Sequence, residues 1–334
     1  MNHGLKITNE KCSKMVALSS EKIIVIIVCV VVVLVVAFVA WAFLWPSRSA
    51  ELQKADIKRR DYDQSIADIQ KVIDGDTANG EVRPESRPIL KTHGKKTARA
   101  VMILHGVSGE PSAMAELADW FYRAGYNVYV PRVPYHGLKD NKLHGQVRAG
   151  DLVKFMSESA GLVSGLGDEL GVIGHSGGGT LATWLVQYSG GLFSRVLLLS
   201  PYYEPAASQA PKWQVSLLRN VYGNHLLPDR FFDGALSYRA LANYVIIKQN
   251  YRSDLKAQGL KHVGLIIGSE DRLIDSAMAS DITEKMAKNS GATFTNETTP
   301  AHMGVGHELI WPGDKAVKQY KKELYDMYVR VYER

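Results

Sequence analysis

The sequence of 334 residues predicts an α/β fold, in which a mostly parallel sheet carries helices on both faces and follows one transmembrane helix. Three observations predict this fold class. An unbroken apolar run lies near the N-terminus. Short aliphatic runs alternate with helical patterns from Ala98 onward, and one of these runs leads into a Gly-x-Ser-x-Gly turn. Strand–helix alternation of this kind is typical of parallel sheets that are buried on both sides.

The composition is that of a folded protein. The chain is 46% hydrophobic and 22% charged, and its net charge of +6 is not concentrated in a basic block with interleaved aromatic residues. A nucleic-acid partner is therefore not expected. Both cysteines, Cys12 and Cys29, lie near the N-terminus, so the rest of the chain has no disulfide and no cysteine-based zinc site.

The apolar run covers residues 23-45, from Ile23 to Trp45. As a helix with a rise of about 1.5 Å per residue it spans about 34 Å, enough to cross a hydrocarbon core of about 30 Å. A strand is excluded because strands rarely exceed about ten residues. A cleaved signal peptide has a shorter apolar core, of about 7–15 residues, although Ser47 and Ser49 offer a weak cleavage site. We therefore expect an N-terminal tail over 1-22 and an uncleaved single-pass anchor that contacts membrane lipid.

The charges on either side of this run do not fix its orientation. Four basic residues precede the run and five follow it closely: Lys6, Lys11, Lys14, Lys22, Arg48, Lys54, Lys58, Arg59 and Arg60. The positive-inside rule depends on an asymmetry in these charges. The side of the membrane that holds the domain therefore stays open, with a slight preference for the outside because the tail is short.

The segment 46-86 is charged but carries a row of isoleucines. Ile66, Ile69 and Ile73 recur at helical spacing after Ile57. This pattern predicts an amphipathic juxtamembrane helix or linker. The alternative is that the segment is the first element of the domain and packs on its core.

Five aliphatic runs from Ala98 onward have the character of buried strands. They are Ala98–Leu104, Asn127–Val130, Leu170–Ile173, Arg195–Leu199 and His262–Ile267. Helical spacing lies between them, at Ser112–Ala124, Ala149–Val163, Gly178–Tyr188 and Ser276–Lys288, and Pro312–Arg334 reads as an amphipathic closing helix.

The alternation breaks over residues 201-260, which are rich in aromatic residues and hold no clear aliphatic strand. We interpret this segment as a cap inserted into the domain. The alternative is a set of helices that pack ordinary aromatic side chains on the core.

The turn Gly174-His175-Ser176-Gly177-Gly178 carries the chemistry. It lies between an aliphatic strand and a helical run, where a serine sits in a sharp turn at the carboxyl end of the sheet. Bulky side chains two positions before or after the serine would collide, so glycines are needed there. The N–H of Gly177 then lies at a helix N-terminus and can stabilise an oxyanion. Ser176 is the predicted nucleophile.

A serine nucleophile needs a base and the base needs an orienting acid. On this kind of sheet the order along the chain is serine, acid, histidine. Asp271 follows the strand His262–Ile267, and His307 lies near the C-terminus. Both have the required order, and alternatives remain in Glu270 and Asp275 for the acid and His302 for the base.

The loop after the first buried strand reads Leu104-His105-Gly106-Val107. The N–H of Val107 is the predicted second oxyanion donor, and His105 is expected to brace the loop. His225 and His262 are expected to be surface or packing residues. No metal site is predicted, because His307-Glu308 lacks the second histidine of a His-Glu-x-x-His helix. No dinucleotide fingerprint follows a strand either, so no cofactor is expected.

Five motifs together resemble the α/β-hydrolase superfamily, and most resemble its monoacylglycerol lipase, carboxylesterase and serine-aminopeptidase-like (S33) branch. They are MILHGVSGEPSAM, PRVPYHG, VIGHSGGG, GSEDRLID and VGHELIW. The resemblance covers the domain over 87-334. It implies an α/β-hydrolase fold with a mostly parallel eight-stranded sheet and a cap at about 201-260. It also implies Ser176 as nucleophile, Asp271 as acid, His307 as base, and Val107 with Gly177 as the oxyanion hole.

The expected activity is that of a membrane-anchored serine hydrolase, which cleaves a small-molecule carboxylic ester or lipid-like substrate through an acyl-enzyme. Dehalogenases and epoxide hydrolases of this fold need an aspartate where Ser176 stands. Two alternatives remain. One is an aminopeptidase or amidase, which would need acidic cap residues such as Glu204, Asp229, Asp233 or Asp254. The other is a non-catalytic, membrane-tethered binding module.

Overall fold

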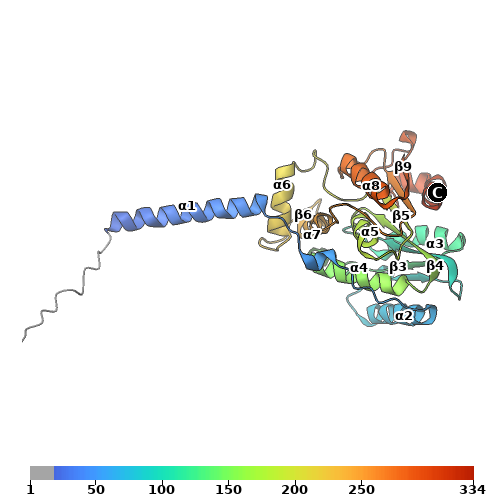
Figure 1. Cartoon of the computed structure of the whole chain (residues 1–334). Helices are drawn as coiled ribbons and strands as arrows, with labels where there is room; N and C mark the ends of the chain where they lie inside the picture. The colour runs from blue at the N-terminus through green and yellow to red at the C-terminus, as the bar shows by residue number, and fades with distance from the viewer. Residues whose placement is uncertain (1–18) are drawn as a thin grey trace, which may run out of the picture. The chain divides into compact units, whose positions relative to one another are not determined.

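The computed structural model describes residues 19–334, and the chain divides into two units, Met1–Leu44 and Trp45–Arg334. Most of the predicted tail over 1-22 therefore lies outside the described residues. In the described part of the first unit, helix α1 runs from Ser20 to Leu44 (Figure 1). It is long and apolar enough to cross a membrane, a test that a signal sequence near an N-terminus also meets. The helix covers the predicted span with an offset of a few residues at its start.

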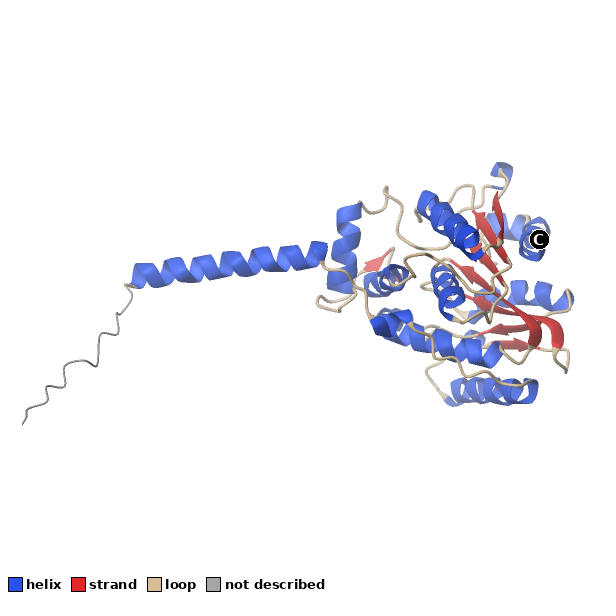
Figure 2. Ribbon diagram, in the orientation of Figure 1, coloured by secondary structure: helices blue, strands red, loops and turns tan. Residues whose placement is uncertain are grey.

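The second unit is built on a seven-stranded sheet (Figure 2). Its strands, in spatial order, are β1 (Ile89–Lys91), β3 (Asn127–Val130), β2 (Thr97–Leu104), β4 (Gly167–His175), β5 (Arg195–Leu199), β8 (His262–Ile267) and β9 (Thr293–Thr298). Only β1 is antiparallel to its neighbour; all other pairs are parallel. The parallel register brings Leu104 beside Gly174 and His175 beside Leu199, so the loops after these strands meet at one edge.

The sheet thus has seven strands in residues 19–334, where the family resemblance implies eight. Residues 62–88, directly before β1, form helix α2 and short turns and do not add a strand to the sheet. Helix α2 (Tyr62–Ala78) begins at a capping box in which Asp61 accepts a hydrogen bond from the Gln64 N–H at 2.9 Å. Between α2 and β1 the chain forms only a single antiparallel bridge, from Val82 to Leu138, and the short helix Pro84–Ser86. From residue 19 to β1, the structure therefore forms helices and this bridge and no further strand.

Helices cover both faces of the sheet (Figure 1). One face is covered by α4 (Ala149–Val163), α5 (Gly177–Tyr188), α7 (Tyr238–Gln249) and α8 (Ser276–Ser290). The other face is covered by α3 (Ala115–Arg123), the short α9 (Lys315–Gln319) and α10 (Lys321–Glu333). The edge strands β1 and β9 were not among the predicted strands, because β1 has three residues and β9 reads TFTNET without an aliphatic run.

Residues of the segment 46-86 pack on the second unit. Ile69 of α2 is fully buried, and α2 lies against α4. Ahead of α2, the Trp184 indole N–H donates to the Leu52 carbonyl at 2.7 Å. The buried Asn250 side chain accepts from the Ser49 N–H at 2.9 Å and donates to the Ser47 carbonyl at 2.8 Å. These bonds hold the first residues of the second unit against α5 and the end of α7.

The aromatic-rich segment 201-260 has two parts. Helix α6 (Lys212–Leu217), a π-helical turn (Leu218–Tyr222) and the hairpin of β6 (Phe231–Phe232) and β7 (Leu236–Ser237) stand outside the sheet. Helix α7 instead packs on α5 and α4, and its Tyr244 is fully buried. Residues 201-260 therefore form both a layer outside the sheet and a helix that packs in the core.

Candidate active site

Ser176 occupies the turn between β4 and α5. Its backbone has φ 52° and ψ −119°, a left-handed conformation that non-glycine residues rarely adopt. The two flanking glycines make the turn possible. A Cβ at Gly174 would lie 2.2 Å from the Gly178 carbonyl oxygen, and a Cβ at Gly178 would lie 2.3 Å from the Leu104 carbonyl oxygen. Because both obstacles are backbone atoms, only glycine fits at either position.

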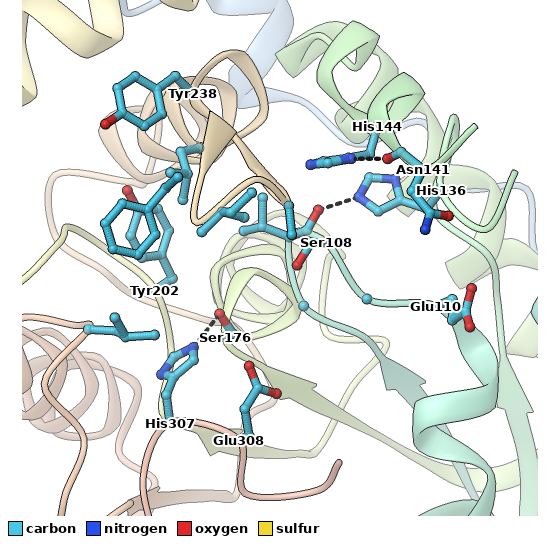
Figure 3. Close-up of a pocket in the computed structure, with 18 of the residues that line it drawn as sticks. Ser108, Glu110, His136, Asn141, His144, Ser176, Tyr202, Tyr238, His307 and Glu308 are labelled. Atoms are coloured by element: carbon cyan, nitrogen blue, oxygen red, sulfur yellow. Dashed lines mark hydrogen bonds between the residues drawn. The ribbon is translucent and has the colours of Figure 1, made fainter. Parts of the chain in front are cut away.

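The structure brings together the three residues predicted for acid–base and nucleophilic roles. The Ser176 hydroxyl donates to His307 Nε2 at 2.8 Å (Figure 3). The His307 Nδ1–H donates to Asp271 Oδ2 at 2.8 Å. Asp271 lies in the loop after β8, and His307 lies in the loop between β9 and α9. Because β4, β8 and β9 are parallel strands of one sheet, their carboxyl ends bring Ser176 and these two loops to the same edge.

Asp271 is held in its charged form. Its side chain is fully buried, which by itself raises the pKa of the carboxyl group. The hydrogen bond and charge of His307, together with hydrogen bonds from Ser200 and the Leu273 N–H, outweigh burial and bring the pKa below its ordinary value. A buried carboxylate at this distance fixes the orientation of the His307 ring.

The alternative acid and base residues lie elsewhere. Glu270 is exposed and pairs with Arg272, while Asp275 caps α8 by accepting from the Met278 N–H at 2.9 Å. His302 is exposed and packs edge-on against the Tyr320 ring. Within residues 19–334, none of the three hydrogen-bonds to Ser176 or to His307.

The two predicted oxyanion donors lie next to each other. A Cβ added at Gly177 would lie 2.6 Å from Val107 Cγ2, so these residues are in close approach beside Ser176. Across residues 19–334, neither the Val107 N–H nor the Gly177 N–H donates a hydrogen bond to another protein group. Both donors are therefore free for a ligand oxygen.

His175 and Ser200 are site residues that the sequence reasoning missed. The buried His175 ring approaches the His307 carbonyl at 2.9 Å through Nε2, and so supports the loop that carries the base. Burial, followed by the nearby His307 ring, lowers the pKa of His175, so its ring stays neutral. Ser200, at the end of β5, supports Asp271. The sequence signal for Ser200 is its position directly after β5, whose carboxyl end lies at the edge of the sheet that holds Ser176.

A pocket of about 1290 Å³ opens above Ser176 and His307 (Figure 3). This volume exceeds the roughly 300–1,000 Å³ of an ordinary small-molecule site. Most of its lining surface is apolar. The large apolar lining residues come from the segment after β2, residues 201-260, the loop after β8 and the loop after β9: Val107, Met114, Tyr202, Trp213, Leu217, Leu218, Tyr222, Phe232, Leu236, Tyr238, Leu241, Leu273, Ile310 and Trp311.

Comparison with known proteins agrees with this architecture. Residues 95–254 match the family model described as serine aminopeptidase, S33. A thermostable monoacylglycerol lipase from a Bacillus species is 32% identical over 88 residues, which are 26% of this chain and 35% of that protein. The match thus spans about a third of the length of this curated relative.

Solved structures share the fold at low sequence identity. A structure of the metagenome-derived lipolytic enzymes LipS and LipT has a TM-score of 0.58 at 18% identity, covering 76% of this chain and 99% of that chain. A soluble variant of the monoglyceride lipase from Saccharomyces cerevisiae has a TM-score of 0.55 at 13% identity, covering 74% and 91%. The chain therefore has an α/β-hydrolase fold, and its residues 95–254 match the family model described as serine aminopeptidase, S33.

Proposed function

We propose that the protein is a membrane-anchored serine hydrolase that cleaves carboxylic esters through an acyl-enzyme on Ser176. One observation carries the proposal: the unbroken chain of hydrogen bonds from Ser176 through His307 to the buried Asp271, at the floor of a large apolar pocket. Two unpaired backbone N–H groups lie beside the same serine. A nucleophile, a base, an orienting acid and an oxyanion site are the parts that acyl transfer needs.

In this mechanism His307 Nε2 removes the hydroxyl proton as Ser176 Oγ attacks the ester carbonyl. Asp271 stabilises the imidazolium that forms. The N–H groups of Val107 and Gly177 donate to the oxyanion of the tetrahedral intermediate. His307 then protonates the leaving alcohol, which breaks the ester bond, and afterwards activates the water that releases the acid from Ser176.

The pocket favours an apolar acyl substrate of the monoacylglycerol or lysophospholipid type. Its volume accommodates a long acyl chain together with a head group. The similarity to a monoacylglycerol lipase supports the same substrate class. Helix α1 supports membrane anchoring through its length and apolar composition, which would keep the enzyme near lipid substrates.

The aminopeptidase alternative has weaker support. An aminopeptidase needs free carboxylates to hold the substrate's ammonium group. Three of the four predicted candidates are already engaged: Glu204 with Lys248, Asp254 with Arg252, and Asp229 with the Ser237 hydroxyl. None of these four residues lines the pocket; the carboxylates that line it are Glu110, Asp140 and Glu308, of which Glu110 pairs with Arg83 and Asp140 accepts from the Lys142 N–H. A non-catalytic binding module is also disfavoured, because it has no need of an aligned serine, histidine and aspartate.

The test uses the full chain in detergent micelles. We expect a fluorophosphonate probe to label the wild type and p-nitrophenyl esters, from acetate to palmitate, to be hydrolysed. Both signals should vanish in Ser176→Ala and persist in the matched control Ser189→Ala, which removes another buried hydroxyl outside the pocket. Turnover of aminoacyl anilides without ester turnover would replace the esterase by the peptidase. Absence of both labelling and turnover in the wild type would overturn the catalytic proposal.

A further inference from the structure

Val107 is held by hydrogen bonds on both of its peptide groups, and each bond involves a buried histidine. The peptide that carries the Val107 N–H also carries the Gly106 carbonyl, and a planar trans peptide points these two groups in opposite directions. The orientation of the Gly106 carbonyl therefore sets the direction of the N–H. The Val107 carbonyl belongs to the next peptide, so fixing it as well removes the remaining rotation about the Val107 Cα.

His105 fixes the first of these peptides. The Val133 N–H donates to His105 Nε2 at 3.1 Å, which assigns the ring proton to Nδ1. Nδ1–H then donates to the Gly106 carbonyl at 3.0 Å. This is the bracing role that the sequence predicts for His105.

His136 fixes the second peptide, although it lies 29 residues further along the chain. Its Nε2 lies 2.6 Å from the Val107 carbonyl oxygen, and its Nδ1 lies 2.8 Å from the Pro134 carbonyl oxygen. A neutral ring donates to only one of two carbonyls, and the shorter contact assigns the proton to Nε2. Burial, followed by the nearby His105 ring, lowers the pKa of His136 to about 3, so the ring is neutral at physiological pH.

The position of His136 is itself rigid. Its side chain is buried, and its ring packs against that of His105 with centroids 5.2 Å apart. Its carbonyl accepts from Arg132 Nη1 at 3.0 Å, and Arg132 pairs with Asp76 of α2. In Figure 3 the His136 ring lies across the pocket from His307, on the side of the oxyanion loop. The backbone of His136 is therefore held by Arg132 and, through Arg132, by Asp76 of α2. Neither residue belongs to the loop that carries Val107.

We propose that His136 is a positioning residue for the oxyanion hole, whose Nε2–H holds the Val107 carbonyl and so aims the Val107 N–H at the reacting carbonyl oxygen. The inference rests on the proposed hydrolase activity. His136 touches neither substrate nor the reacting atoms in this role. It acts on the transition state, where the oxyanion exists, and not on substrate binding.

The experiment compares His136→Phe, which keeps an aromatic ring but removes the donor, with His136→Gln, whose amide keeps a donor near the position of Nε2. Loss of a whole oxyanion donor costs about 10²–10³ in kcat, so a misdirected donor should cost about tenfold to a hundredfold. We expect His136→Phe to lose this much kcat with little change in KM. It should lose the same factor in affinity for a trifluoromethyl ketone, which forms an oxyanion on Ser176. We expect His136→Gln to recover most of both.

His262→Phe is the matched control. His262 is also buried and approaches a backbone carbonyl, that of Val331, at 2.7 Å through Nε2, but it does not line the pocket. All rates are divided by the concentration of sites that a fluorophosphonate labels, so that loss of folded protein does not count. Equal losses in both phenylalanine variants, or a kcat loss in His136→Phe with unchanged affinity for the ketone, would overturn the proposal. An unlabelled and inactive wild type would instead refute the proposed function, and this inference with it.

Discussion

Replacing Asp271 by asparagine tests the proposed mechanism most sharply. Asp271 Oδ1 accepts from the Leu273 N–H at 2.9 Å, which keeps an oxygen at that position in the variant. The amide NH₂ group of the new asparagine then faces His307 Nδ1. A donor in that position forces Nδ1 to accept, so the ring proton moves to Nε2 and points at the Ser176 hydroxyl. A base in this tautomer cannot take the serine proton.

The electrostatic loss can be calculated from the same contact. Asp271 Oδ2 lies 2.8 Å from His307 Nδ1, and the carboxylate is fully buried. With an effective dielectric constant of about 20, a unit charge pair at this distance is worth about 6 kcal/mol. At about 1.4 kcal/mol for each factor of ten, this corresponds to a loss of about 10⁴ in kcat. The backbone has no reason to move, since aspartate and asparagine have nearly the same shape.

The assay is ester hydrolysis by the full chain in detergent, with Glu270→Gln as control. Glu270 is adjacent in sequence and loses the same charge, but it is exposed and pairs only with Arg272. We expect Glu270→Gln to keep wild-type kcat and Asp271→Asn to lose about four orders of magnitude in kcat while it stays folded at neutral pH. If Asp271→Asn retained more than a tenth of wild-type kcat, the assigned role of Asp271 would be wrong.

Three further predictions follow from the packing and the charges. Gly178→Ala should destabilise the protein by about 3 kcal/mol or more, measured by denaturant unfolding, because its Cβ meets the Leu104 carbonyl; Gly150→Ala, with open space around it, should cost less, and an equal cost would contradict the clash. Asn250→Ala should lower the free energy of unfolding by about 2–4 kcal/mol, because it leaves the Ser49 N–H and the Ser47 carbonyl unpaired. The control is Asn289→Ala, at an exposed position, and equal melting temperatures of the two variants would refute this reasoning. The pKa of Asp271 is lowered in the folded state, so its charge stabilises the fold above the ordinary value near 3.8, and this stability is lost as the pH falls below it. The melting temperature of Asp271→Asn should therefore decline less than that of the wild type on acidification, and parallel curves would contradict the linkage.

Much of the fold could be predicted because its signals are local. The length of the apolar run is sufficient to predict α1, and the strands β3, β5 and β8 begin and end where their aliphatic runs do. Buried parallel strands need apolar side chains on both faces, so they are visible as continuous runs. The turn at Ser176 could be predicted for the same reason, because only glycine fits two positions before and two positions after the serine.

The edges of the sheet could not be predicted in the same way. An edge strand has only one neighbour and can expose its side chains, so β9 has a polar sequence and β1 needs only three residues. The isoleucines of α2 predicted an amphipathic helix but not the surface that it covers. That surface belongs to α4, which lies far away in the sequence, and only the assembled fold brings the two together.

The candidate site shows the same division. The residue types and their order along the chain determined which serine, aspartate and histidine to consider, because acyl transfer needs those groups and this sheet presents them in that order. The sequence favours Asp271 over Glu270 by its place in the motif, and only the tertiary structure shows that of these two adjacent carboxylates one is buried against His307 and the other faces solvent. It alone brought His136 to the Val107 carbonyl and His175 to the His307 carbonyl. Such contacts join distant loops through hydrogen bonds to backbone atoms, which every residue carries, so they leave no pattern in the sequence.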